Sequence, residues 1–166
     1  MVGLSVVDVK NFMAGILTGN LFDKFYLRDG EIQTFTEFHF GGYLNPSYYD
    51  TEEWESLNGR ELPLWSELRP FAFQLIKGHK LPVRFKFVFQ LSDENTQWVF
   101  DRYHPPVKRE DVGGLFMNIT YDHQNLVCTS GVSYRTFVMD KTLEQCWDET
   151  VCQFFKQNHI AYEKLG

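Results

Sequence analysis

The feature of the sequence that most constrains the fold is a run from Val83 to Leu91 in which phenylalanines alternate with other residues. The alternating positions are Phe85, Phe87 and Phe89, with Arg84 before them, Lys86 and Val88 between them and Gln90 after them. Because successive side chains of a β-strand point to opposite faces, this period of two predicts a strand with one buried face and one partly wet face. The fold should therefore contain a sheet with at least one covered face.

Short strands and capped helices alternate along the rest of the chain. The expected strands span residues 2–7, 22–27, 32–40, 83–91, 115–121 and 126–138, and the expected helices span about 9–18, 67–77, 93–103 and 142–157. Asp8, Ser66 and Ser92 precede three of these helices, where a short polar side chain accepts hydrogen bonds from the first helical N–H groups. Asp29-Gly30 predicts a tight turn between two strands.

Written in order, these elements form β-α-β-β-α twice, in halves of about 1–78 and 79–166. The sequence therefore predicts a single α+β domain over residues 1–166, built from two duplicated β-α-β-β-α halves. Their strands should join one largely antiparallel sheet with the helices packed on one face, because a sheet with an apolar face needs helices to cover it.

Composition excludes several classes of protein. Aromatic residues make up 17% of the chain, which supplies ample surface to bury. The net charge of −6 argues against a protein that coats nucleic acid. Three cysteines without C-x-x-C spacing predict reduced thiols, and no signal peptide or membrane-spanning run is present. We therefore expect a cytoplasmic protein that does not enter a membrane, and the oligomeric state stays open.

Four segments resemble an uncharacterised bacterial family of short single-domain proteins, and the resemblance covers nearly the whole chain. The segments are 68–71 (LRPF), 84–89 (RFKFVF), 114–116 (GLF) and 143–149 (LEQCWDE). This resemblance implies no particular activity.

The order of elements is also similar to one domain of the sliding clamps of DNA replication. That likeness implies a curved sheet outside, two helices on the DNA-facing side and a link to DNA metabolism. The chain departs from the clamp pattern in two ways. A clamp subunit joins two or three such domains whereas this chain has room for one, and the connector at 45–78 and the closing helix are additions.

The connector contains the most conspicuous candidate contact surface. It gathers the aromatic residues Tyr43, Tyr48, Tyr49, Trp54 and Trp65 and the acidic residues Asp50, Glu52, Glu53 and Glu55. Aromatic side chains on loops are favoured where proteins meet partners. The alternative is that the connector folds back as a lid and buries them, and the sequence does not separate the two.

A basic stretch around the central strand is the candidate for nucleic-acid contact. It contains Lys77, His79, Lys80, Arg84 and Lys86, interleaved with phenylalanines. Basic and aromatic side chains together suit a phosphate backbone and stacked bases. The period of two places those phenylalanines in the core, however, and leaves only a basic solvent face. Direct nucleic-acid binding is therefore not expected.

No catalytic, cofactor or metal motif occurs. A Walker loop, a dinucleotide fingerprint, a G-x-S-x-G elbow and an H-E-x-x-H sequence are all absent, and the five histidines have no ligand spacing. We therefore predict a non-enzymatic binding or adaptor module that works through protein contacts, with no cofactor, metal or catalytic residue. The alternative is a small-molecule enzyme or ligand-binding protein with a pocket between the sheet and residues 43–78, using His39, His123 or Arg69.

Overall fold

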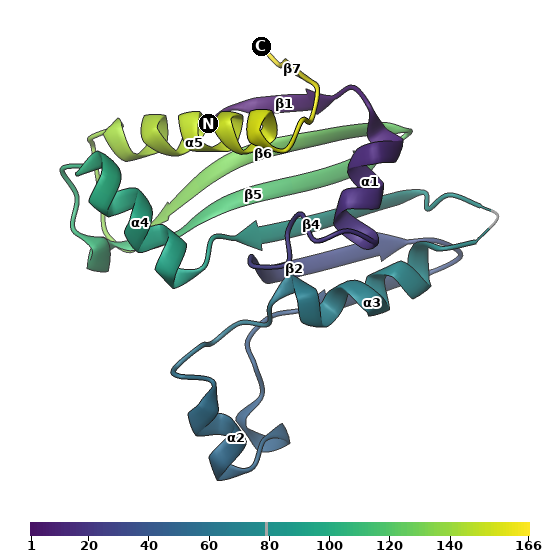
Figure 1. Cartoon of the computed structure of the whole chain (residues 1–166), viewed down its shortest axis with the longest axis horizontal. Helices are drawn as coiled ribbons and strands as arrows, with labels where there is room; N and C mark the ends of the chain where they lie inside the picture. Colours follow the sequence, from purple (N-terminus) through teal and green to yellow (C-terminus); the bar gives the residue numbers. More distant parts are fainter. Residues whose placement is uncertain (79) are drawn as a thin grey trace.

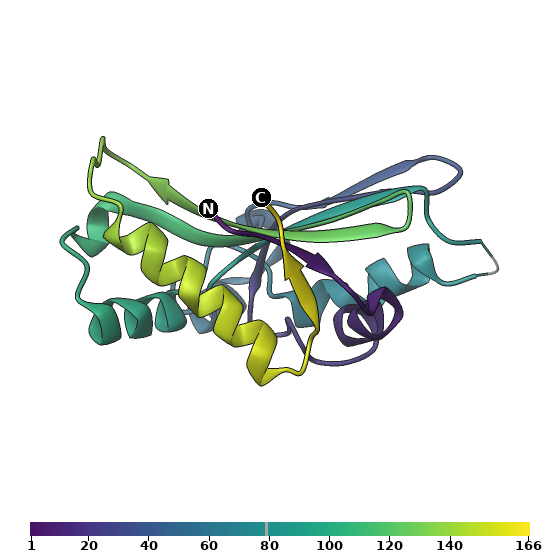
Figure 2. The ribbon, with the colours of Figure 1, turned by 90° about the horizontal axis from the view of Figure 1, so that it is seen from above.

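A computed structural model describes residues 1–78 and 80–166 as one antiparallel sheet of seven strands with helices on one face (Figures 1 and 2). The strands are β1 (Gly3–Val6), β2 (Tyr26–Gln33), β3 (Glu37–Gly41), β4 (Arg84–Gln90), β5 (Val112–Asp122), β6 (Asn125–Tyr134) and β7 (Tyr162–Lys164), in the order β3-β2-β4-β5-β6-β1-β7. The helices are α1 (Val9–Leu17), α2 (Thr51–Ser56), α3 (Trp65–Ile76), α4 (Asp93–Tyr103) and α5 (Thr142–Gln157), with 3-10 turns at η1 (Pro46–Tyr48) and η2 (Arg109–Asp111).

The central strand is the one that the phenylalanine alternation predicts. Phe85, Phe87 and Phe89 of β4 are fully buried, and the residues between them lie half-buried on the opposite face. Figure 2 shows α1, α3, α4 and α5 on the same side of the sheet, so the phenylalanines face the helices. The predicted α+β class and the antiparallel sheet with helices on one face are confirmed.

The two halves of the chain are interleaved in the sheet. β4 pairs with β2 of the first half, and β1 pairs with β6 of the second half and with β7. Three strands of the second half, β4, β5 and β6, therefore separate β1 from β2. One hydrophobic core contains side chains from both halves. The duplication and the clamp likeness stay predictions, since the order of elements along the chain is all that supports them.

The structure corrects the predicted turn at Asp29-Gly30. Both residues lie inside β2, and the hairpin turns at residues 34–36 instead. Gly30 pairs with Phe40, and a Cβ added at Gly30 would meet the Phe40 ring at 3.0 Å. This glycine is therefore suited to close packing across the strands and not to a turn.

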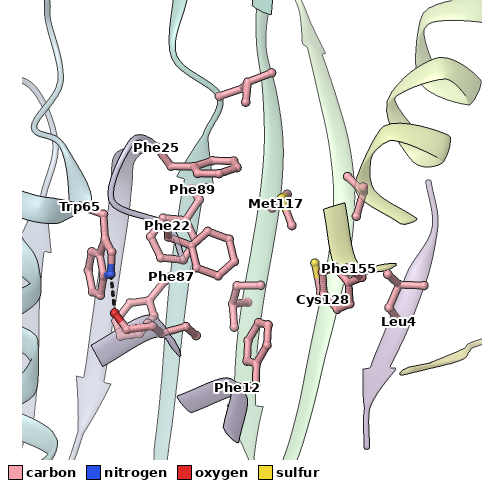
Figure 3. Packing of buried hydrophobic residues seen from close by; sticks show 14 of the residues in the cluster. Leu4, Phe12, Phe22, Phe25, Trp65, Phe87, Phe89, Met117, Cys128 and Phe155 are labelled. Carbon is pink, nitrogen blue, oxygen red and sulfur yellow. Dashed lines mark hydrogen bonds between the residues drawn. The ribbon is translucent and has the colours of Figure 1, made fainter. Parts of the chain in front are cut away.

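A second correction concerns the predicted strand 22–27, of which only the last two residues belong to β2. Phe22 and Phe25 lie in the turns before it and are both buried. The Phe22 ring stacks on Phe89 at 4.4 Å between centroids and also packs against Phe12 (Figure 3). It packs against Phe154 as well, at 5.5 Å between centroids. Packing on the sheet, and not strand pairing, is therefore what these apolar residues provide.

The core also holds two of the three cysteines. Cys128 and Cys152 are buried, Cys146 is half-buried, and all three are free thiols. Burial raises the pKa of the Cys128 thiol well above its usual range, which keeps it protonated and unreactive.

Among residues 1–78 and 80–166, no helix combines the length and the apolar character that crossing a membrane requires.

Candidate functional site

The chain between β3 and α3 leaves the body of the domain as an arm, residues 43–61 (Figure 1). The two sides of the arm are joined near its base by a backbone hydrogen bond of 2.8 Å from Leu44 N to the Glu61 carbonyl. Neither η1 nor α2, which form its far end, contains a buried residue. Burial resumes at Leu62 and Pro63, where the chain returns to the sheet. The connector is therefore not a lid over the core.

The arm is ordered by its own short-range contacts. Glu53 N donates to Asp50 Oδ1 at 2.7 Å and Asp50 N donates to Glu53 Oε1 at 3.2 Å, which makes a capping box at the start of α2. The Tyr49 ring lies 5.3 Å from Tyr48 and 5.6 Å from Trp54. A helix of six residues is too short to be stable alone, so these caps and ring contacts determine its shape.

Most of the predicted contact residues are exposed on this arm. The exposed fractions are 62% for Tyr43, 81% for Tyr48 and 37% for Trp54, and Tyr49 is half-buried between its neighbours. Trp65 is different, because it is fully buried at the start of α3 and its Nε1 donates to the Ile16 carbonyl at 2.8 Å. Trp65 therefore belongs to the core and not to a contact surface.

Two arginines, which the sequence did not single out, hold the base of the arm. Arg28 Nη1 donates to the Tyr43 hydroxyl at 2.9 Å, with its guanidinium 4.9 Å from the centre of that ring. Arg60 forms an ion pair with Glu67 at 2.5 Å, and Glu67 also accepts from Leu64 N at 2.8 Å. These contacts join the arm to β2 and to the first turn of α3.

The Arg60–Glu67 pair should make stability depend on pH. The hydrogen bond from Arg60 lowers the pKa of Glu67, so the stabilisation is present above the ordinary carboxyl pKa and is lost as pH falls through the lowered value. We expect Glu67→Gln to reduce the free energy of unfolding by about 0.5–1 kcal/mol at neutral pH, since the pair is partly exposed. Urea denaturation of the unmodified domain and of the Glu67→Gln variant should show that the difference between their free energies of unfolding becomes smaller below about pH 4.

Glu163→Gln is the matched control for this experiment. Glu163 is exposed on β7 and forms no ion pair among the residues that the structure describes, so its replacement should change stability by less than about 0.5 kcal/mol. A Glu67→Gln effect of equal size at neutral and acidic pH would contradict the ion-pair explanation.

The outer surface of the arm is acidic. Its charged residues are Asp50, Glu52, Glu53, Glu55, Arg60 and Glu61. Because Arg60 is paired with Glu67 on α3, the carboxylates dominate the part of the arm that faces solvent. A surface that combines exposed aromatic rings with carboxylates is complementary to an apolar surface with basic residues around it.

The predicted nucleic-acid residues do not form an uninterrupted basic surface. Lys77 and Lys80 are exposed after α3, whereas Arg84 and Lys86 lie on the open face of the sheet. Arg84 Nη1 binds Glu31 Oε1 at 3.1 Å, and Glu31 is also the cross-strand partner of Lys86. His79 lies outside the described residues.

An acidic cluster occupies the same open face. Ligand-type atoms of Glu31, Glu37 and His39 lie within 4.8 Å of one another. Gln33 donates to both glutamates at 2.9 and 3.2 Å, and the His39 imidazole lies 3.5 Å from Glu37. With Arg84 also bound to Glu31, neighbouring protein groups account for this arrangement without a metal ion.

The residues of the alternative pocket hypothesis lie apart. Arg69 is on α3 and forms a bidentate pair with Asp23 at 2.9 and 3.1 Å on the helical side. His39 is exposed on the open face of β3, and His123 is exposed in the β5–β6 turn. A shallow cavity of about 410 Å³ does lie at the base of the arm, lined in part by Tyr26, Arg60 and Leu64, but it contains none of the three.

The fold and the arm define an α+β domain with one half-covered antiparallel sheet and a projecting aromatic arm. The chain belongs to DUF5721, a family of unknown function, a model of which matches residues 15–163. The predicted membership of an uncharacterised family that covers nearly the whole chain is thereby confirmed, and the matched range includes the arm. No curated protein and no solved structure matches the chain.

Proposed function

We propose that this domain is a non-enzymatic binding or adaptor module that holds a protein partner through the arm. The observation that supports the proposal is that the arm presents Tyr43, Tyr48 and Trp54 to solvent on a framework ordered by its own caps. Ordered aromatic side chains lose little conformational freedom on binding, and tyrosine and tryptophan are enriched among the residues that dominate interfaces.

Charge indicates the kind of partner. The carboxylates around the rings favour a partner whose apolar contact surface is surrounded by lysine or arginine. Such a complex should weaken as salt concentration rises, because the charged rim is exposed to solvent. A link to DNA metabolism depends on the clamp-like order of elements alone, and the cytoplasm is the compartment that fits the free thiols.

The ligand-pocket alternative has weaker support. Both terminal nitrogens of Arg60, which lines the cavity at the base of the arm, already donate to Glu67. The cavity therefore offers no unpaired guanidinium for a ligand. On the arm, Arg28 contacts the Tyr43 ring, but among the rings of residues 1–78 and 80–166 the exposed Tyr48 and Trp54 contact only Tyr49.

Capture experiments test the arm directly. We expect Tyr48→Ala/Trp54→Ala to weaken binding of the partner captured from a lysate of the host by about 100-fold or more, since each ring should act as an interface anchor worth about 2 kcal/mol. Mass spectrometry identifies the partner, and a titration with the purified partner measures the affinity.

The matched control is Phe35→Ala/Phe137→Ala, which removes two aromatic rings that are 92% and 89% exposed outside the arm. This variant should retain the partner. The proposal is wrong if the folded arm variant binds every captured protein as tightly as the unmodified domain.

A further inference from the structure

A second candidate site lies on the helical face, where α4 and α5 leave a groove of about 510 Å³ between them. The groove combines an apolar side, formed by Leu91, Val99 and Phe154, with polar and aromatic groups. These groups are Asn95, Trp98, Arg102 and Tyr103 on α4 and Thr150, Gln153 and Gln157 on α5. A concave, partly apolar surface of this volume, with a few polar groups converging on it, is typical of ligand sites.

Arg102 is the distinctive charged group of the groove. Its guanidinium carbon lies 5.3 Å from the centre of the Trp98 ring and 5.5 Å from that of Tyr103. The neighbouring carboxylate, Asp101, instead accepts a hydrogen bond of 2.9 Å from Gln97. Within residues 1–78 and 80–166, no carboxylate pairs with Arg102. Contact with two rings restricts the guanidinium plane, and its N–H groups stay available to an anion.

Primary amides line the same groove. Within the described chain, the side chains of Asn95, Gln153 and Gln157 donate no hydrogen bond and accept none from a protein group. Each amide offers both a donor and an acceptor, which is the pattern that a peptide group or a carboxylic acid derivative requires. Trp98, which is 51% exposed, adds a flat apolar surface beside them.

A neighbouring cavity extends the groove. This cavity, of about 420 Å³, shares Leu91, Asn95 and Phe154 with the groove and continues to Lys24 and Phe25 before β2. The groove and this cavity together can therefore accept a ligand that extends well beyond its anionic group. It lies on α4 and α5, whereas the arm leaves the chain between β3 and α3, so the two sites use different residues.

We propose that the α4–α5 groove binds ligands in which a carboxylate is joined to an aromatic body. Arg102 pairs with the carboxylate, Trp98 and Phe154 contact the aromatic ring, and Gln153 and Gln157 bind amide groups of the ligand. A free aromatic acid and the C-terminal end of a peptide share this chemistry, and the test below distinguishes them. The inference is independent of the arm and of its protein partner.

The test uses NMR titration of the labelled full-length protein with N-acetylphenylalanine, and with N-acetylphenylalanine amide as the matched neutral probe. We expect millimolar affinity for the acid, as befits a ligand of its size, and at least about tenfold weaker binding of the amide. The shifts should centre on the Trp98 indole N–H and on the Gln153 and Gln157 side-chain amides.

Two variants assign the effect to the guanidinium. Arg102→Gln should weaken binding of the acid by at least about tenfold, while Lys156→Gln, which removes an exposed cation of α5 that does not line the groove, should leave it unchanged. Equal binding of acid and amide, no binding of the acid, or full binding by a folded Arg102→Gln variant would each overturn the proposal.

Two further probes identify the source of the ligand. N-acetyl-alanyl-phenylalanine adds a peptide group before the terminal residue, and phenylacetate lacks any amide. Tighter binding of the dipeptide indicates that the groove recognises a peptide C-terminus through Gln153 and Gln157. Binding of phenylacetate that is equal or tighter indicates a small aromatic acid.

Discussion

Replacing Trp65 by alanine should lower the free energy of unfolding by about 3–5 kcal/mol, whereas replacing Trp54 by alanine should lower it by less than about 0.5 kcal/mol. Trp65 is fully buried, packs on Phe87 and Phe89 at 5.0 and 5.1 Å between ring centroids, and donates to the Ile16 carbonyl. Among the aromatic rings of the described residues, Trp54 contacts only Tyr49.

Urea denaturation, followed by circular dichroism, measures both values. Because a domain of this size is stabilised by about 5–15 kcal/mol, the Trp65 variant loses a large share of its stability. Trp65→Phe is a useful intermediate, since it keeps most of the ring but leaves the Ile16 carbonyl without its indole donor. A loss below about 1 kcal/mol for Trp65→Ala would contradict its place in the core.

Replacing Phe22 by alanine should also cost about 3–5 kcal/mol, although Phe22 lies in a turn and in no regular element. Its ring is fully buried and has four aromatic neighbours, Phe12, Phe25, Phe89 and Phe154, with centroids between 4.4 and 6.0 Å away. Removing the ring leaves a cavity where helices α1 and α5 meet the sheet, and these elements cannot all move in to fill it.

Phe71→Ala is the matched control, because this residue is the same amino acid on α3 but is 67% exposed. Its loss should change the free energy of unfolding by less than about 0.5 kcal/mol. Chemical denaturation of the two variants side by side provides the comparison, and similar stability for both would show that the Phe22 cluster is not a packed centre of the fold.

Much of the architecture could be predicted from the sequence because it depends on local periodicity. The alternation in 83–91 predicts β4 and its buried face, and the Asp8 and Ser92 caps do accept the expected backbone hydrogen bonds at the starts of α1 and α4. The strand order could not be predicted in the same way, since it depends on which strands far apart in the chain pair with each other.

The sequence predictions that the structure corrects were wrong because tertiary packing overrides the local pattern at those positions. Asp29-Gly30 has the local character of a turn, but packing of Phe40 over Gly30 places both residues within a strand. Trp65 follows the connector aromatics closely in sequence, and only its position at the start of α3 takes it into the core. The predicted cap Ser66 lies inside α3, which begins at Trp65 with Leu64 as its N-cap, and Glu67 accepts from Leu64 N in the capping-box position.

The aromatic arm could be predicted in part from the sequence, whereas the α4–α5 groove could not, because the groove depends on tertiary contacts. The aromatic composition of the arm was visible in the sequence, but its projection from the body was not, because composition does not determine whether a loop packs. The groove joins Arg102 of α4 to Gln153 of α5, residues about fifty positions apart. No local pattern connects them, so their proximity is evident only once the helices are placed.

The interleaved sheet has a consequence for synthesis on the ribosome. β1 (Gly3–Val6) is synthesised well before β6 (Asn125–Tyr134) and β7 (Tyr162–Lys164), the two strands with which it pairs. β1 can therefore pair only after β6 has been translated, and until then Leu4 and Val6, which are buried in the folded domain, lack their packing partners in the sheet. Because pairing over such sequence separations is slow, this late closure delays completion of the sheet and exposes the nascent chain to misassociation or to chaperones in the interval.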